Sequence, residues 1–365
     1  MQFQNSSKIT PAAVALATLL TAGSAMAQSA SLRTDTFSQP TLDRWFYPFG
    51  GTPGAEISAS VFRTPSDATV NGVAAFDDRD AQLVVAFDTA PLIQKMRGPN
   101  CYRLTSLRLT LTTSNPPRFA YDPSYDNPLV ADTDPGTPVE VFGAGYRNGF
   151  NATTITEGMP FAFAAPYTEG VRNIFAAQLN ADGSVQRDIS NQIRDGFEAP
   201  PMAIGQVAGL TPGDLVPQAS TMTFDLDLTQ PSVKKYLQNA FDQGRLVLVV
   251  SSLHLAAGGP GGGGEPNYPA FYTKENPIQQ SIQVAAKLDV TMNLSVNIDF
   301  NNDDSVFDPM DIDAFLSVYS EGPCLPAGAE CGDIDFNNDT GLFDPMDIND
   351  FLSVYSEGPC STGNC

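Results

Sequence analysis

Apolar and polar residues alternate along several short stretches of the chain. Residues 107–111 are Leu-Arg-Leu-Thr-Leu, and residues 222–228 are Met-Thr-Phe-Asp-Leu-Asp-Leu. A period of two is typical of a β-strand that buries one face. A nearly continuous apolar run predicts another strand at 81–87, and residues 246–255 and 288–292 are further strand candidates.

One segment instead repeats its apolar residues every three or four positions. Pro231 suits the first turn of a helix, and Gly244 suits the position after the last turn. We therefore expect a helix between these two residues. Its apolar positions are Val233, Tyr236, Leu237 and Ala240.

A hairpin signal completes the pattern. Asp182-Gly183 separates the apolar segments 174–179 and 185–189, as a tight turn between two strands would. The glycine run at 258–264 is interpreted as a flexible loop, because no helix that could bind phosphate follows it. Many short strands with one or two helices predict a mainly β protein, a jelly-roll-like β-sandwich over residues 28–292.

The order of these segments resembles the DNRLRE-type jelly-roll modules of secreted bacterial proteins. Where those modules have Ser-x-Glu, this chain has Thr273-Lys274-Glu275. The resemblance covers most of 70–292 and implies a fold and a surface-module role, with no catalytic residues. The segments that carry it are Phe76–Asp88, Leu104–Thr113, Phe224–Leu228, Gly244–Ser252 and Phe271–Asn276.

The charged residues are unevenly distributed along the chain. The 365 residues are 42% hydrophobic, enough for a sizeable core, and carry a net charge of −22. The 75 residues from Thr291 onward hold 15 acidic residues and neither Lys nor Arg. Such acidity disfavours nucleic acid and anionic membrane as partners, and it places a domain boundary near residue 292.

The first 27 residues are typical of a signal peptide. Lys8 gives a short positive region, residues 12–22 are small and apolar, and Ala25-Met26-Ala27 resembles a cleavage site before Gln28. The alternative is an anchor retained in the membrane. We expect cleavage, no membrane span afterwards, and a secreted, extracellular or cell-surface protein.

Export permits disulfides. Four cysteines crowd the C-terminal segment, and the favoured pairings are Cys324–Cys331 and Cys360–Cys365 among three alternatives. A zinc site is the competing interpretation, although these spacings without histidine fit it poorly. Cys101 is expected to be a buried thiol without a catalytic role.

The acidic segment contains a duplication. Residues 298–324 and 334–360 match at 22 of 27 positions, 36 residues apart. Each copy has Asp-x-Asn-x-Asp followed by Asp-Pro-Met-Asp, and closely spaced oxygen ligands suit a hard cation such as Ca²⁺. Two calcium sites are therefore predicted, with Asp311 and Asp347 closing the two loops. The candidate ligands are Asp299, Asn301, Asp303, Ser305, Asp308 and Asp311 in the first copy, and Asp335, Asn337, Asp339, Gly341, Asp344 and Asp347 in the second.

A helical apolar pattern follows each loop, so each copy predicts an EF-hand-like loop–helix unit. One helix face is expected to contain Ile312, Phe315, Leu316 and Tyr319, and the other Ile348, Phe351, Leu352 and Tyr355.

The motifs I-D-F-N-N-D, F-D-P-M-D-I and F-L-S-V-Y-S-E-G-P-C resemble the GC-type dockerin-like domains at the C-termini of exported bacterial proteins. The resemblance covers about 296–365 within a predicted domain at 293–365, and it implies anchoring or docking to a cohesin-like protein or a cell-surface receptor. Asp311 falls at loop position 13 rather than the 12 usual for dockerins. The glycine expected at position 6 is replaced by Asp304 and Thr340, and only in the second copy does a glycine, Gly341, follow. The first loop is therefore expected to bind calcium more weakly than the second, unless Asp304 compensates by adopting a positive φ.

Two functions remain open. The only histidine, His254, lies at an apolar strand without a G-x-S-x-G motif, which favours a non-catalytic module displayed through its calcium-loaded tail. The alternative is a carbohydrate-binding module or a polysaccharide-degrading glycoside hydrolase that carries a dockerin. Rings that could stack on sugars are Trp45, Phe46, Tyr47, Tyr121 and Tyr125.

Overall fold

A computed structural model describes most of the chain between residues 32 and 355. The signal-peptide segment, the glycine run and most of both predicted calcium loops lie outside the described residues. The described ranges are 32–47, 56–64, 69–70, 73–74, 77–95, 98–158, 172–256, 267–294, 300–301, 309–320, 322–323, 325 and 345–355.

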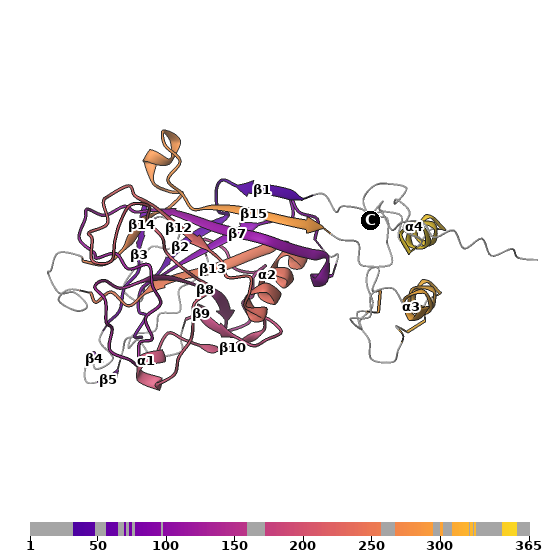
Figure 1. Ribbon diagram of the computed structural model, residues 1–365, viewed down its shortest axis with the longest axis horizontal. Helices are drawn as coiled ribbons and strands as arrows, with labels where there is room; N and C mark the ends of the chain where they lie inside the picture. The colour runs from indigo at the N-terminus through magenta and orange to yellow at the C-terminus, as the bar shows by residue number, and fades with distance from the viewer. Residues whose placement is uncertain are drawn as a thin grey trace, which may run out of the picture.

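The protein is mainly β, and its two larger sheets are antiparallel throughout (Figure 1). The first sheet has the order β1-β15-β7-β12: Arg33–Phe37, Lys287–Leu294, Tyr102–Thr112 and Thr221–Asp225. The second has the order β10-β9-β8-β13-β6-β2: Val185–Asp188, Ile174–Leu179, Val139–Tyr146, Arg245–Ser252, Gln82–Asp88 and Leu42–Phe46.

Short elements complete the described structure. The strand β11 (Ala203–Ile204) pairs with β8. Two-stranded sheets pair β3 (Ser58–Ser60) with β14 (Ala270–Tyr272) and β4 (Thr69–Val70) with β5 (Val73–Ala74). The helices are α1 (Gln192–Asp195), α2 (Pro231–Gln243), α3 (Pro309–Tyr319) and α4 (Pro345–Tyr355), with 3-10 turns at Pro99–Cys101 and Pro277–Gln280.

The main core lies between the two larger sheets. Leu107, Leu109 and Leu111 of β7 are at most 1% exposed, which confirms the alternation in the sequence. Leu109 pairs in register with Phe224 on one side and Leu288 on the other, so three neighbouring strands present apolar side chains at one level. The second sheet contributes buried residues from β6, β8 and β13 to the same cluster, giving the arrangement of a β-sandwich.

Helix α2 covers one end of this core. Val233, Leu237 and Ala240 are buried and Tyr236 packs against the same cluster, as the helical period predicts. Phe241, which the prediction did not include, is buried as well. Pro231 is its first residue, and Gly244 caps its end with a φ of 78°, a backbone conformation that glycine adopts without strain. Both predicted helix boundaries are therefore confirmed.

The Asp-Gly hairpin is also confirmed. Strands β9 and β10 flank Asp182-Gly183, and Gly183 has a φ of 79°. The 222–228 strand is shorter than its alternation predicts: β12 ends at Asp225. The reason is local, because the Asp227 carboxylate accepts hydrogen bonds from the backbone and hydroxyl of Thr229, forming a turn that leads into α2.

The outer face of the second sheet has its own smaller core. Val84, Val247 and Phe142 are buried there beneath the segments around Ile155 and Ile189. This explains why β6 and β13 are apolar on both faces, whereas β7 alternates. Within the described residues, no helix has the length and apolarity needed to cross a bilayer.

Candidate functional site

The helices that follow the two repeats pack against each other through equivalent aromatic residues. Phe315 of α3 and Phe351 of α4 stack in parallel, with ring centroids 4.2 Å apart. Phe300, which precedes α3, meets both rings edge-on at 5.1 and 6.0 Å. All three rings are at most 1% exposed, so the duplicated units share one small core.

This aromatic core positions residues of the predicted calcium loops. Asn301 directly follows Phe300 and is buried, and its backbone N–H donates to the Asp311 carboxylate at 3.3 Å. Asp311 and Asp347 occupy the first turns of α3 and α4 and are fully buried. A carboxylate at a helix N-terminus is favoured by the helix dipole, and a buried carboxylate requires compensating partners.

The structure therefore brings together Asn301 and Asp311, and it gives Asp347 the equivalent place in the second repeat. It also buries Asp350, which the sequence interpretation did not select. The remaining candidate ligands lie outside the described residues: Asp299, Asp303, Ser305, Asp308, Asp335, Asn337, Asp339, Gly341 and Asp344. The four tail cysteines also lie outside them, so their pairing stays a prediction.

One expectation for the helices is wrong. Leu316 and Leu352 are 44% and 41% exposed rather than buried with Phe315 and Phe351. The helices meet along the line through the two phenylalanines, so the neighbouring leucines lie beside the contact and face solvent. Met310 and Met346, also equivalent positions, are 41% and 45% exposed. The pair of helices thus displays matched apolar side chains.

His254 is a buried histidine whose two ring nitrogens both have partners. Its Nε2 lies 3.2 Å from the Ala120 carbonyl oxygen, and its Nδ1 lies 2.7 Å from the Ser252 hydroxyl, which also donates to the Pro138 carbonyl at 2.8 Å. Phe119 meets the ring edge-on. Ser252 is fully buried, and the far side of the imidazole faces a carbonyl rather than a carboxylate. These contacts account for His254 as a structural residue at the end of β13.

His254 leads to a pH-dependence prediction. Burial lowers its pKa from 6.5 to about 4. The unfolded chain therefore binds a proton in this window that the folded chain does not, so stability is full above pH 6.5 and is lost as the pH falls toward 4. Relative to a His254→Gln variant, the wild type should lose about 2 kcal/mol between pH 7 and pH 5 in urea unfolding. Equal losses in both proteins would contradict the low pKa.

The aromatic residues proposed to stack on sugars are mostly packed into the body. Phe46 and Tyr121 are 3% and 4% exposed, and the Tyr121 hydroxyl accepts from the backbone of Val207. Trp45 is half-buried and stacks on Tyr47 at 5.0 Å. Tyr125 lines a surface groove beside Pro200, Pro201 and Met202. The five rings therefore do not form one sugar-binding platform.

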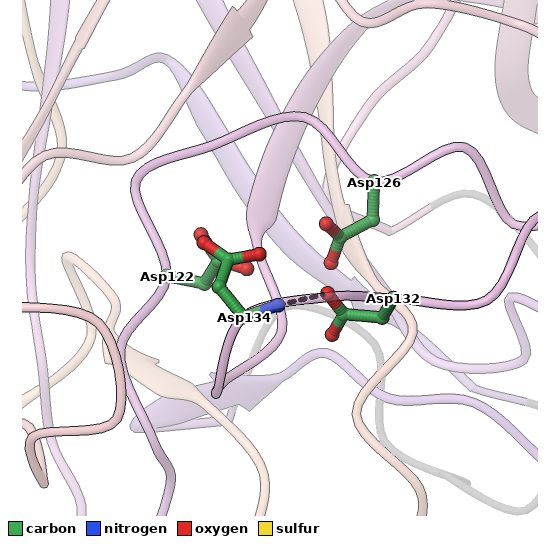
Figure 2. A group of neighbouring side chains, drawn as sticks. All are labelled: Asp122, Asp126, Asp132 and Asp134. Carbon is green, nitrogen blue, oxygen red and sulfur yellow. Dashed lines mark hydrogen bonds between the residues drawn. The ribbon is translucent and has the colours of Figure 1, made fainter.

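The structure reveals an acidic cluster that the sequence interpretation missed. Asp122, Asp126, Asp132 and Asp134 come from one irregular segment between β7 and β8, and Figure 2 shows their carboxylates turned toward one another. Burial, together with the charges of the three neighbouring aspartates, raises the pKa of Asp126 to about 7. The available signal was a local concentration of four aspartates within residues 122–134.

The segment 122–134 contains Asp122, Asp126, Asp132 and Asp134, and all four of its aspartates converge. Their spacing of four, six and two residues matches no regular loop motif. Their proximity is set by how the segment folds back on itself, which the sequence pattern does not encode.

A second acidic group has a different character. Asp43, Glu157 and Glu275 surround the Lys274 ammonium, which lies 2.9 Å from Asp43 and 2.6 Å from Glu275 and also contacts Glu157. Burial raises the pKa of Asp43 to about 7, and Lys274 opposes that shift. A protein cation therefore already compensates this group. Lys274 is the residue at the centre of the Thr-Lys-Glu sequence noted above.

Comparison with known proteins adds no relative: no protein-family model, curated protein or solved structure matches the chain. The two family resemblances therefore rest on the quoted motifs alone.

Proposed function

We propose that this is a secreted or cell-surface β-sandwich protein of the jelly-roll type, anchored through a calcium-dependent, dockerin-like tail. The observation that carries the proposal is the duplicated loop–helix unit. Its two helices share one aromatic core, and each buries an equivalent aspartate in its first turn. The signal-peptide pattern supports export, and the acidity of the tail supports cation binding.

The residues of each loop suit calcium in their chemistry. They offer carboxylate, amide and backbone oxygens and neither imidazole nor thiolate, the donor set that hard cations prefer. Asp311 and Asp347 would close the two sites from the helix side. Because Asn301 donates its backbone N–H to Asp311, the first and last parts of loop one are already linked.

Docking would use the outer faces of α3 and α4. Met310, Leu316, Met346 and Leu352 are exposed at positions related by the repeat. Exposed apolar side chains arranged in matched pairs suit a protein partner, such as a cohesin-like domain or a surface receptor. Calcium would act by fixing the two loops, and hence the relative placement of the helices that carry these residues.

Calcium titration of the full mature chain tests the proposal. Asp311→Asn and Asp347→Asn should each weaken one site by at least about tenfold, because even outer partners of a metal ligand contribute that much. Asp313→Asn is the matched control, since Asp313 is exposed on α3 and the second repeat has Asn349 there. If calorimetric titration shows unchanged calcium binding in both the Asp311→Asn and the Asp347→Asn variant, the assignment of these two residues as calcium ligands is refuted.

The partner is tested with the same proteins. In the presence of calcium, the wild type and the Asp313→Asn variant should both capture the same cell-surface protein and release it when calcium is chelated. The Asp311→Asn, Asp347→Asn double variant should not capture that protein.

The carbohydrate alternative has one supporting observation. A groove of about 380 Å³ is lined by Tyr268, Tyr272, Asn115, Gln218 and Asn276, a mixture of rings and amides that suits a sugar. A glycan array and a hydrolysis assay on the mature chain separate the two functions. Turnover of any polysaccharide would overturn the non-catalytic proposal, independently of calcium binding by the tail.

A further inference from the structure

The four-aspartate cluster lies in a long irregular segment of the β-sandwich body, far in sequence from the tail. The segment connects β7 to β8, and irregular connections of this length are commonly functional. Its two ends are held together: Gly136 lies so close to Tyr121 that an added Cβ would come within 2.4 Å of the Tyr121 carbonyl. The Tyr121 backbone is itself hydrogen-bonded to the backbone of Asp214 and Gly213. The two ends of the segment that carries the cluster are therefore held in place.

The spacing of the carboxylates fits one cation. One oxygen from each aspartate lies within 4.8 Å of the corresponding oxygen of every other. Ligand oxygens on calcium lie about 2.4 Å from the metal, so two of them are separated by at most about 4.8 Å. All four oxygens can thus belong to a single coordination sphere. Figure 2 shows Asp122 and Asp134 on one side of the group and Asp126 and Asp132 on the other.

A buried carboxylate in the cluster indicates a missing partner independently of this spacing. Asp122 is only 2% exposed, and its Oδ1 accepts from the backbone and hydroxyl of Ser124. Its Oδ2 is buried and has no hydrogen-bond partner within the described part of the chain. A buried carboxylate oxygen without a donor is costly, and a cation would remove that cost.

The cluster also lacks a protein counter-ion among the described residues. No ion pair between these four aspartates and Lys or Arg occurs there, whereas Lys274 compensates the group of Asp43, Glu157 and Glu275. The charge of the group around Asp43 is therefore compensated by a lysine, whereas the four-aspartate cluster has no such compensation among the described residues.

We propose that Asp122, Asp126, Asp132 and Asp134 bind one calcium ion in the β-sandwich body, a site separate from the two tail loops. The ligands are oxygens only, which excludes a preference for zinc or copper and favours calcium. The ion ties the 122–134 segment down. Because Tyr125 lies in this segment and lines the groove beside Pro200, calcium also fixes one wall of that groove.

The test uses the full mature chain with calcium alone as the probe. In an Asp311→Asn, Asp347→Asn background, titration should still show one bound calcium, and adding Asp126→Asn with Asp132→Asn should abolish it. The control is Asp195→Asn, which removes one exposed carboxylate charge outside any cluster. Because the two tail sites are impaired in this variant, the experiment measures calcium binding by the body whether or not the tail of the wild type binds calcium.

Thermal unfolding of the body provides a second readout, because the difference in melting temperature between variant and wild type should change sign when calcium is added. In chelator, Asp126→Asn with Asp132→Asn should raise the melting temperature, because repulsion within the cluster is removed. In calcium, the wild type should gain stability and the variant should not. Should the variant misfold, Asp132→Asn alone is the substitute, since asparagine keeps the oxygen that accepts from the Asp134 backbone. Equal calcium binding by the cluster variant and the control, or no calcium-dependent shift in the wild type, would overturn the site.

Discussion

Replacing Phe315 with alanine is expected to unfold the pair of tail helices and, with them, to abolish the calcium binding that we propose for the two loops. Phe315 is fully buried and contacts Phe300, Phe351 and Tyr319. Deleting a buried phenylalanine ring costs about 3–5 kcal/mol. A cluster this small has little stability in reserve, so the loss exceeds what the unit can tolerate.

Hydrogen exchange followed by mass spectrometry measures this effect segment by segment in the full chain. The peptides covering α3 and α4 should lose protection, while those from β7 and β13 keep theirs. Leu316→Ala is the control, because Leu316 neighbours Phe315 in sequence but is 44% exposed; its effect should stay within about 0.5 kcal/mol. Similar loss of protection in both variants would show that the stacked phenylalanines do not hold the helices together.

Replacing Arg79 with methionine is expected to destabilise the β-sandwich body by about 3–5 kcal/mol, because it leaves a buried carboxylate without its partner. Arg79 and Glu140 are fully buried and lie 2.5 Å apart, and Arg79 also donates to Gln192 at 2.9 Å. Burial raises the pKa of Glu140, and Arg79 opposes that shift. Without Arg79, Glu140 would take up a proton or draw in water.

An exposed pair in the same protein provides the control. Arg108 and Asp225 pair across β7 and β12 at 2.6 Å, but their side chains are 52% and 61% exposed. Arg108→Met should therefore cost less than about 1 kcal/mol in urea unfolding. The Arg79→Met, Glu140→Met double variant should lose less unfolding free energy than the two single variants lose together. Additive losses at the buried pair would contradict the assignment of its cost to an unpaired charge.

The alternation of side chains predicted the strands well where one face meets the core. Leu107, Leu109 and Leu111 are buried because a period of two places them on the same face of β7. Helix α2 was equally clear, since Pro231 and Gly244 act through backbone geometry that depends only on their immediate neighbours. The aspartate turn at Asp227, by contrast, ended β12 before its alternating pattern did.

The tail shows the limit of a helical pattern. A period of 3.6 placed Leu316 and Leu352 on the apolar face with Phe315 and Phe351, yet only the phenylalanines are buried. The pattern gives the width of an apolar stripe, whereas the line of contact depends on how the second helix crosses it. The duplication predicted that equivalent residues would play equivalent roles, and the pairing of Phe315 with Phe351 agrees with this.

By itself, the sequence determined the mainly β class, the bounds of α2, the Asp-Gly hairpin and the two helices of the repeated unit, because these depend on local periodicity and turn chemistry. Only the tertiary structure decided which distant residues meet. Arg79 pairs with Glu140, 61 positions away, and four irregularly spaced aspartates converge in the segment between β7 and β8. Such contacts depend on how long connections fold over the sheets, and no local pattern records that path.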